Sequence, residues 1–135
     1  MKYNGIVQRK LTLLDEQVMR LRQHLDGVTA EAFAESWALR SMTERALQVA
    51  VEIVIDIAER IIAIEGAGPV PGASAAIDRL VTLGVLPSAE PYRTMVGFRN
   101  MIVHQYERVD PALVYELATR RLDDFRQFRD ELDRL

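Results

Sequence analysis

The sequence predicts an all-α protein, a four- to five-helix up-and-down bundle within a single domain over residues 1–135. Hydrophobic residues recur every three or four positions along most of the chain, which is the spacing of one face of an α-helix. One stretch alone, residues 65–74, holds enough glycine and proline to require a long loop. The length of 135 residues also suits one hydrophobic core and not two.

The first predicted helix follows an apolar seam with spacings of four and three residues, and Asp26 and Gly27 end it. The seam consists of Val7, Leu11, Leu14, Val18, Leu21 and Leu25. A short second helix is expected across Thr29–Glu35. Both elements fit a bundle in which each helix buries one stripe against its neighbours.

Residues 28–65 contain neither glycine nor proline, and we predict a long helix over most of this run. A strand has to be weighed here, because β-branched residues alternate from Val51 to Ile57. The acidic residues Glu52, Asp56 and Glu59 are spaced by four and three, however, which matches a solvated helix face. No turn residue divides the run into lengths typical of strands, so the helix is favoured.

Two shorter helices are predicted after the glycine- and proline-rich loop. Ser74 is expected to cap the first of them, and Gly84 to end it with a left-handed backbone. Ser88 is expected to cap the next helix, with Pro91 in its first turn, where the missing N–H matters little.

The last predicted helix begins at Asp110 and Pro111, a pair typical of a cap and a first helical position. No glycine or further proline follows, so we expect a single helix that continues to the end of the sequence. Its apolar line consists of Val114, Ala118, Leu122, Phe125, Phe128, Leu132 and Leu135.

Composition excludes several classes of function. The chain has no cysteine, which removes thiol catalysis, thiolate zinc sites and disulfides. Charges recur every few residues near the N-terminus, so we expect a cytoplasmic protein without a signal peptide or a membrane span. The net charge of −3 argues against a domain that coats nucleic acid by bulk positive charge, although a local basic site stays open.

Polar groups that can do chemistry concentrate near the end of the helix that follows Ser88. Arg99, Asn100, His104 and Tyr106 fall within eight residues. On a helix, Asn100 and His104 lie about 40° apart, and Arg99 and Tyr106 about 20° apart. Arg99 and His104 are separated by roughly 7.5 Å along the axis, which allows both side chains to reach one phosphate.

These residue types fit the cleavage of a phosphodiester. Histidine exchanges protons near neutral pH, so His104 can take a proton from a ribose 2′-OH or return one to the leaving oxygen. The permanent charge of Arg99 can stabilise the negative charge that develops on the phosphate. Asn100 can orient the imidazole or the phosphate through a hydrogen bond. An alternative stays open, because such residues near a helix end are also common cap and dipole partners.

The sequence implies neither a metal nor a cofactor. Two histidines and scattered carboxylates show no ligand cluster of recognisable spacing, so a hydrolytic site would work by acid–base chemistry alone. We expect His24, which lies outside the motif, to be a surface or packing residue. Four arginines of the last helix alternate with aspartates and are expected to form a salt-bridged surface, namely Arg120, Arg121, Arg126 and Arg129.

The run MVGFRNMIVHQYERVDPALVYELATRRLDDFRQF resembles the C-terminal half of the HepT-like branch of the HEPN superfamily. That branch is marked by arginine, a polar residue, three further residues, histidine, any residue and tyrosine. These positions are Arg99, Asn100, His104 and Tyr106 here. The earlier segment SWALRSMTERALQVAVEIVIDIAERI resembles the second helix of the same family, and the glycine- and proline-rich loop also matches.

The resemblance implies a HEPN-like bundle that serves as the toxin of a two-gene toxin–antitoxin pair. Such a toxin is a metal-independent endoribonuclease that acts on RNA as a homodimer. Carried over position by position, Arg99 and His104 would be catalytic and Asn100 supporting. Tyr106 would accept AMP, transferred from ATP by a minimal nucleotidyltransferase that is the antitoxin. The new phosphate beside Arg99 would compete with RNA and silence the enzyme.

Two other classes of function stay open. A non-catalytic helical module would bind the nucleotidyltransferase or a nucleotide through the same polar patch, and its expression would not be toxic. A plain helical scaffold would change in stability, and in no activity, when His104 is substituted.

Overall fold

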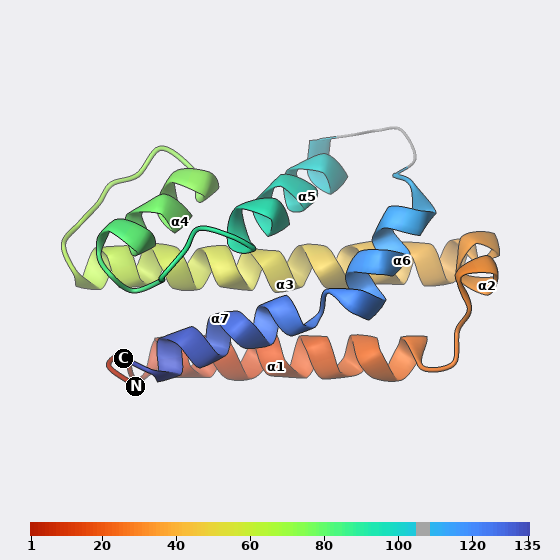
Figure 1. Cartoon of the computed structure of the whole chain (residues 1–135), viewed down its shortest axis with the longest axis horizontal. Helices are drawn as coiled ribbons and strands as arrows, with labels where there is room; N and C mark the ends of the chain where they lie inside the picture. Colours follow the sequence, from red (N-terminus) through yellow and green to blue (C-terminus); the bar gives the residue numbers. More distant parts are fainter. Residues whose placement is uncertain (105–108) are drawn as a thin grey trace.

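The computed structural model describes residues 1–104 and 109–135. Within them the chain forms seven helices and no strand, as Figure 1 shows. The helices are α1 (Ile6–Leu25), α2 (Ala30–Glu35), α3 (Trp37–Ile64), α4 (Ala73–Thr82), α5 (Tyr92–His104), α6 (Pro111–Arg120) and α7 (Asp123–Asp133). The predicted all-α class is therefore confirmed.

The long helix α3 is the central element of the bundle. It packs against α1, α4, α5 and α6. In Figure 1, α1 runs along one side of α3, while α4 and α5 lie on the other side. Helix α3 therefore separates α5 from α1.

Local capping explains the end of α1 and the starts of α2 and α3. Gly27, with a φ of 74°, follows the end of α1, whose predicted seam faces the core. The Thr29 hydroxyl accepts a hydrogen bond from the Ala32 N–H at 3.1 Å at the start of α2. Ser36 Oγ accepts one from the Leu39 N–H, also at 3.1 Å, at the start of α3. The long helix is confirmed, and the strand alternative is excluded.

Helix α4 begins earlier than predicted. It begins at Ala73 with Gly72 at the capping position, and Ser74 lies inside its first turn. The Gly72 carbonyl accepts a hydrogen bond from the Ala76 N–H at 3.0 Å, so the backbone closes the first turn without a serine cap. The predicted end is confirmed, because Gly84 follows the helix with a φ of 77°.

The predicted capping of α5 is wrong in detail. The helix begins at Tyr92, so Pro91 lies immediately before it and not in its first turn. Ser88 Oγ accepts a hydrogen bond from the Glu90 N–H at 3.3 Å within the preceding turn. The Glu90 carboxylate takes the capping role, because it accepts bonds from the N–H and the hydroxyl of Thr94 at 3.3 and 2.6 Å.

The single last helix that the sequence predicted is divided into α6 and α7. The division falls at Arg121 and Leu122, where Arg121 has a φ of −116°. It allows α6 to pack against α1, α2 and α3 while α7 continues along α1. An ion pair of 2.9 Å from Arg121 Nε to Asp124 Oδ2 spans the junction. Neither glycine nor proline marks this position, which explains why the prediction missed it.

Buried hydrophobic side chains from all seven helices form one core cluster. Thr43 and Glu131 are the polar side chains buried with it among the described residues. In the same part of the chain, no helix combines the length and the hydrophobicity needed to cross a membrane.

Candidate active site

The helix that carries the predicted motif, α5, is fixed in the core by its first residue. Tyr92 is fully buried, and its hydroxyl lies 2.7 and 2.9 Å from the two carboxylate oxygens of Glu131, to which it donates. Its ring meets the ring of Phe128 edge-on, with 5.3 Å between centroids. Burial, and then the hydrogen bond to Glu131, raises the pKa of Tyr92 far above its usual range. Sequence reasoning missed this pair, because no local signal links residues so far apart.

Arg99 lies two turns further along α5 and is half-buried. Its Nε is shielded from solvent and has no hydrogen-bond partner in the described part of the chain. Among the described residues, Thr43 Oγ1 and Arg60 Nε are also buried without a hydrogen-bond partner. Arg60 Nε, however, lies 3.3 Å from the Asp56 carboxylate. Arg99 forms no ion pair with any described residue. A buried donor without a partner is unfavourable, so this guanidinium suits an acceptor from outside the described chain.

Asn100 and His104 stand at the exposed end of the same helix. Both side chains are exposed, and His104 is the last residue of α5. Residues four apart share one helix face, so the amide and the imidazole occupy adjacent turns. The second half of α5 therefore carries a guanidinium, an amide and an imidazole, with Arg99 and His104 about 140° apart around the helix axis.

The fourth predicted residue, Tyr106, lies outside the described residues. The description resumes at Val109, which is buried. Asp110 Oδ1 then accepts a hydrogen bond from the Ala112 N–H at 3.0 Å, and Pro111 is the first residue of α6. The predicted cap and first-position pair is confirmed.

The cap-and-dipole alternative accounts for only part of this arrangement. Within the described residues, the side chains of Arg99, Asn100 and His104 form no hydrogen bond to a helix carbonyl. Only the position of His104 in the last turn fits a dipole partner. In the same residues, no three histidine, cysteine or acidic side chains gather where they could hold a metal ion. The arrangement can perform proton transfer beside a fixed positive charge.

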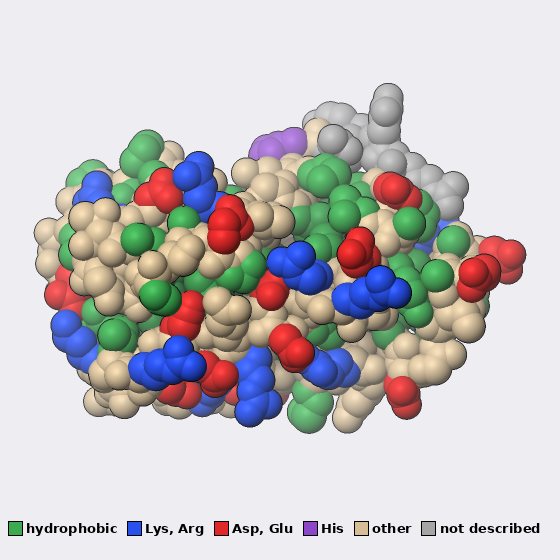
Figure 2. Space-filling model, in the orientation of Figure 1, with side chains coloured by type: hydrophobic (Ala, Val, Ile, Leu, Met, Phe, Trp, Pro, Cys, Tyr) green, Lys and Arg blue, Asp and Glu red, His purple; other side chains and the backbone are tan. Residues whose placement is uncertain are grey.

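A mainly apolar hollow lies beside the first half of α5. Met95, Phe98 and Leu117 line it, together with residues of α3 and α7. Figure 2 shows hydrophobic side chains gathered between α5 and α6. Val103, in the last turn of α5, is 42% exposed. Exposed apolar side chains of this kind are common at interaction surfaces.

The other basic residues that the sequence singled out lie elsewhere. His24 is exposed on α1, as predicted. Arg121 forms an ion pair with Asp124, and Arg129 forms one with Asp15. The expected salt-bridged surface is thus confirmed for these two arginines.

A family profile described as ribonuclease HepT-like matches residues 14–132. The match spans most of the chain and includes the motif on α5. The chain belongs to the ribonuclease HepT-like family. The predicted HEPN-type recognition and the assignment as an endoribonuclease are thereby confirmed at the level of the family.

Individual relatives agree with the family. The chain is 29% identical over 131 residues to the mRNA nuclease HepT of Shewanella oneidensis, which covers 94% of this chain and 96% of the relative. One solved structure, a toxin–antitoxin with AMP-PNP, has a TM-score of 0.88 at 24% identity and covers 98% of this chain and 100% of its own. Another is the tri-AMPylated HEPN toxin of Shewanella oneidensis in complex with MNT antitoxin. Its TM-score is 0.89 at 24% identity, with the same coverage.

Proposed function

We propose that the chain is the toxin of a toxin–antitoxin pair and cleaves RNA without a metal, with Arg99 and His104 as catalytic residues and Asn100 as a supporting residue. One observation carries the proposal. A half-buried arginine whose Nε has no partner in the described chain shares one end of α5 with an exposed histidine. Membership in the ribonuclease HepT-like family and the relative named an mRNA nuclease support the same chemistry. The protein acts in the cytoplasm as a single domain.

The reaction is a transfer of the phosphate within the RNA strand. The ribose 2′-oxygen attacks the phosphorus, the bond to the 5′-oxygen breaks, and the products end in a 2′,3′-cyclic phosphate and a 5′-hydroxyl. A histidine takes the proton of the 2′-OH, and an imidazolium returns one to the 5′-oxygen. The guanidinium of Arg99 stabilises the added negative charge on the phosphate, and Asn100 orients the imidazole or the phosphate.

A homodimer divides these two proton transfers between chains. Each chain carries a single motif histidine, whereas two His104 side chains facing one cleft can serve as base and acid. The apolar side chains between α5 and α6, with the exposed Val103 in the last turn of α5, are the surface that a second copy would cover. Association through it would bring the two motifs together.

The antitoxin partner is a minimal nucleotidyltransferase that modifies Tyr106. The tyrosine oxygen attacks the α-phosphate of ATP, and pyrophosphate leaves, which places AMP on the hydroxyl. The added phosphate charge and nucleoside then compete with RNA for Arg99. The tri-AMPylated HEPN toxin of Shewanella oneidensis, whose structure is in complex with MNT antitoxin, supports this regulation.

Cleavage is tested with the purified chain and RNA in the presence of a chelator. We expect 2′,3′-cyclic phosphate ends, and a loss of cleavage of about 10²- to 10⁴-fold in His104→Ala. His24→Ala is the matched control, because His24 is the other histidine of the chain and lies exposed on α1. Equal cleavage by His104→Ala and the control would contradict the proposal. Partner binding without any cleavage would favour the non-catalytic module instead.

Modification is tested by expression with and without the neighbouring gene, followed by intact-mass measurement. We expect a gain of one or more AMP units on the peptide that contains Tyr106, together with relief of growth arrest. Tyr106→Phe should abolish the gain. Tyr115→Phe is the control, because that hydroxyl is occupied by a 2.5 Å bond to the Val28 carbonyl. AMP on Tyr106→Phe would refute the assignment of the acceptor.

A further inference from the structure

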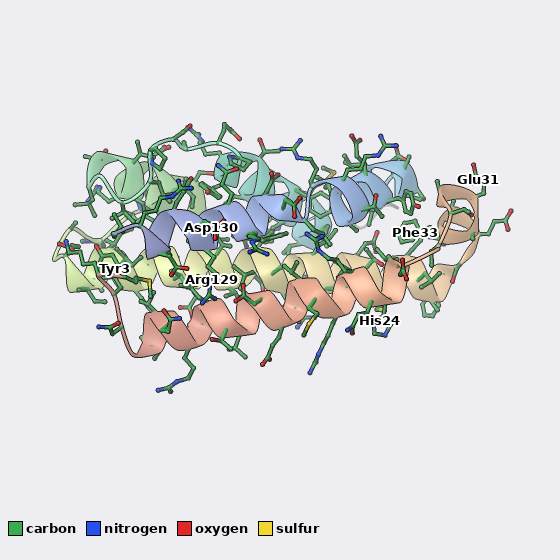
Figure 3. All side chains as sticks on the ribbon, turned by 60° about the horizontal axis from the view of Figure 1, so that its bottom comes forward. Tyr3, His24, Glu31, Phe33, Arg129 and Asp130 are labelled. Carbon is green, nitrogen blue, oxygen red and sulfur yellow. The ribbon has the colours of Figure 1, made fainter. Side chains whose placement is uncertain are left out.

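A second group of basic side chains lies between α1 and α3. Arg20 and His24 are one turn apart on α1, Arg45 comes from α3, and all three are exposed and line one hollow. Gln17 Nε2 donates a hydrogen bond of 3.3 Å to the Ala46 carbonyl and joins the two helices there. Figure 3 shows His24 on α1, toward the end of the molecule that carries α2.

Among the described residues, no carboxylate pairs with the charges of this hollow. The side chains of Arg20 and Arg45 form neither a hydrogen bond nor an ion pair with a described residue, and no described carboxylate lines the hollow. His24 Nδ1 donates to the Arg20 carbonyl at 2.8 Å, which orients the ring. Its Nε2 has no partner among the described residues. Two guanidinium groups and the free Nε2 of an imidazole therefore line the hollow without a partner among the described residues.

The hollow between α1 and α7 is also lined by basic side chains, and two of them have acidic partners. There Arg22 lies 2.5 Å from the Asp123 carboxylate, and Arg129 forms ion pairs with Asp15 and Asp133. Figure 3 shows Arg129 in this region, between the two helices. Aspartates compensate Arg22 and Arg129 at that place. The hollow of Arg20, His24 and Arg45 lacks such compensation in a chain of net charge −3.

We propose that the hollow of Arg20, His24 and Arg45 binds the phosphate backbone of single-stranded RNA away from the bond that is cleaved. This inference rests on the proposed ribonuclease function. Guanidinium groups match phosphate oxygens in a bidentate way, and two or three adjacent cations can hold neighbouring phosphates. The apolar floor of Leu21 and Met42 suits the sugars and bases between those phosphates.

The position of the hollow separates it from the cleavage site. Helices α1 and α5 lie on opposite sides of α3 in Figure 1. A trinucleotide bound for cleavage at the end of α5 has only two phosphates, so it offers few contacts to the hollow, whereas a long strand can extend to it. Because the net charge repels RNA elsewhere, local cations of this kind must supply the attraction.

Binding is measured with a 2′-O-methyl RNA, which lacks the attacking hydroxyl and is not cleaved. We expect the double variant Arg20→Gln/Arg45→Gln to bind at least about tenfold more weakly than the wild type at low salt. The slope of log affinity against log salt should fall by about 1.4, which is two phosphate contacts at about 0.7 each. Cleavage of long RNA should fall in parallel, while cleavage of a trinucleotide stays unchanged.

The control is the double variant Arg22→Gln/Arg93→Gln. It removes the same charge from exposed arginines that already have aspartate partners, Asp123 and Asp78. Circular dichroism checks that both variants are folded, which we expect because all four side chains are exposed. A salt slope equal to that of the control would overturn the inference.

The remaining outcomes separate this inference from the proposed function. If the wild type neither cleaves nor binds RNA, both are wrong. If the trinucleotide is cleaved but Arg20→Gln/Arg45→Gln binds long RNA like the control, only the inference falls. If that variant keeps its RNA affinity and loses the antitoxin, the hollow is a surface for an acidic protein, and the inference falls as well.

Discussion

The two ends of α5 differ in every property that matters for their roles. At the first residue, Tyr92 is fully buried and donates to Glu131 in the core. At the last residue, His104 is exposed and hydrogen-bonds to no described side chain. Arg99 lies between them, half-buried, with an Nε that has no partner in the described chain.

This contrast shows how one helix can both stabilise the fold and carry the residues proposed for catalysis. The first end satisfies its polar atoms within the protein, so it stabilises the fold and holds the helix in place. The other end keeps its polar atoms for a ligand, which costs stability but leaves charge and a proton carrier available. The two ends should therefore respond to substitution in opposite ways.

Among the substitutions that test this comparison, the largest effect is expected from Arg99→Ala. Cleavage should fall by about 10²- to 10³-fold, because a donor to the developing charge is lost. The melting temperature should hold or rise, because a buried Nε without a partner is removed. Kinetics of RNA cleavage and calorimetry measure the two quantities. Arg93→Ala, at an exposed position on the same helix, is the control. A large loss of stability in Arg99→Ala would break the comparison.

Tyr92→Phe should show the opposite pattern. The variant leaves the buried Glu131 carboxylate with only a 3.4 Å contact from Gln127 Nε2, so we expect a loss of about 2 kcal/mol of unfolding free energy. Activity below the unfolding transition should persist. Denaturant unfolding and cleavage kinetics measure both. The double variant Tyr92→Phe/Glu131→Gln should recover part of the loss, and failure to do so would argue against the buried bond as its cause.

High pH should also weaken the anchored end. The pKa of Tyr92 is raised by burial, and that of Tyr3 is raised to about 12 by burial and by Glu65. When the pKa of a tyrosine is higher in the folded than in the unfolded protein, its stabilising contribution is fully present below the unfolded pKa near 10. This contribution is lost as the pH rises towards the folded pKa. Each buried tyrosine then costs about 1.4 kcal/mol per pH unit. Unfolding from pH 8 to 11 should show a shallower decline in Tyr92→Phe than in the wild type.

The smallest effect is expected from the cap at the anchored end. Glu90→Ala removes the carboxylate that accepts from the Thr94 N–H and hydroxyl, so we expect a loss of about 0.5 to 1 kcal/mol. Glu59→Ala, an exposed acidic position on α3, is the control. Thermal unfolding of both variants measures the difference, and equal stability would show that the cap is not formed.

The sequence predicted the parts of the fold that local patterns specify. Apolar periodicity predicted α1 and α3, and glycine and proline predicted the long loop and the end of α4. The junction at Arg121 and Leu122 was not predicted, because it depends on the packing of α6 against α2 and α3 in addition to α1, the helix that α7 also contacts. At the candidate site, spacing alone placed Arg99, Asn100 and His104 on one helix. The sequence did not predict the Tyr92–Glu131 hydrogen bond or the hollow that Arg45 lines with residues of α1. Both depend on packing between distant segments.

The ends of the bundle also have a practical consequence. Figure 1 places residues 1 and 135 close together in the view, at the end of the molecule opposite α2 and far from the last turn of α5. A surface linkage or a fluorescent fusion attached at either residue would stand clear of Arg99 and His104. Immobilised chains should therefore accept RNA from solution as readily as free ones.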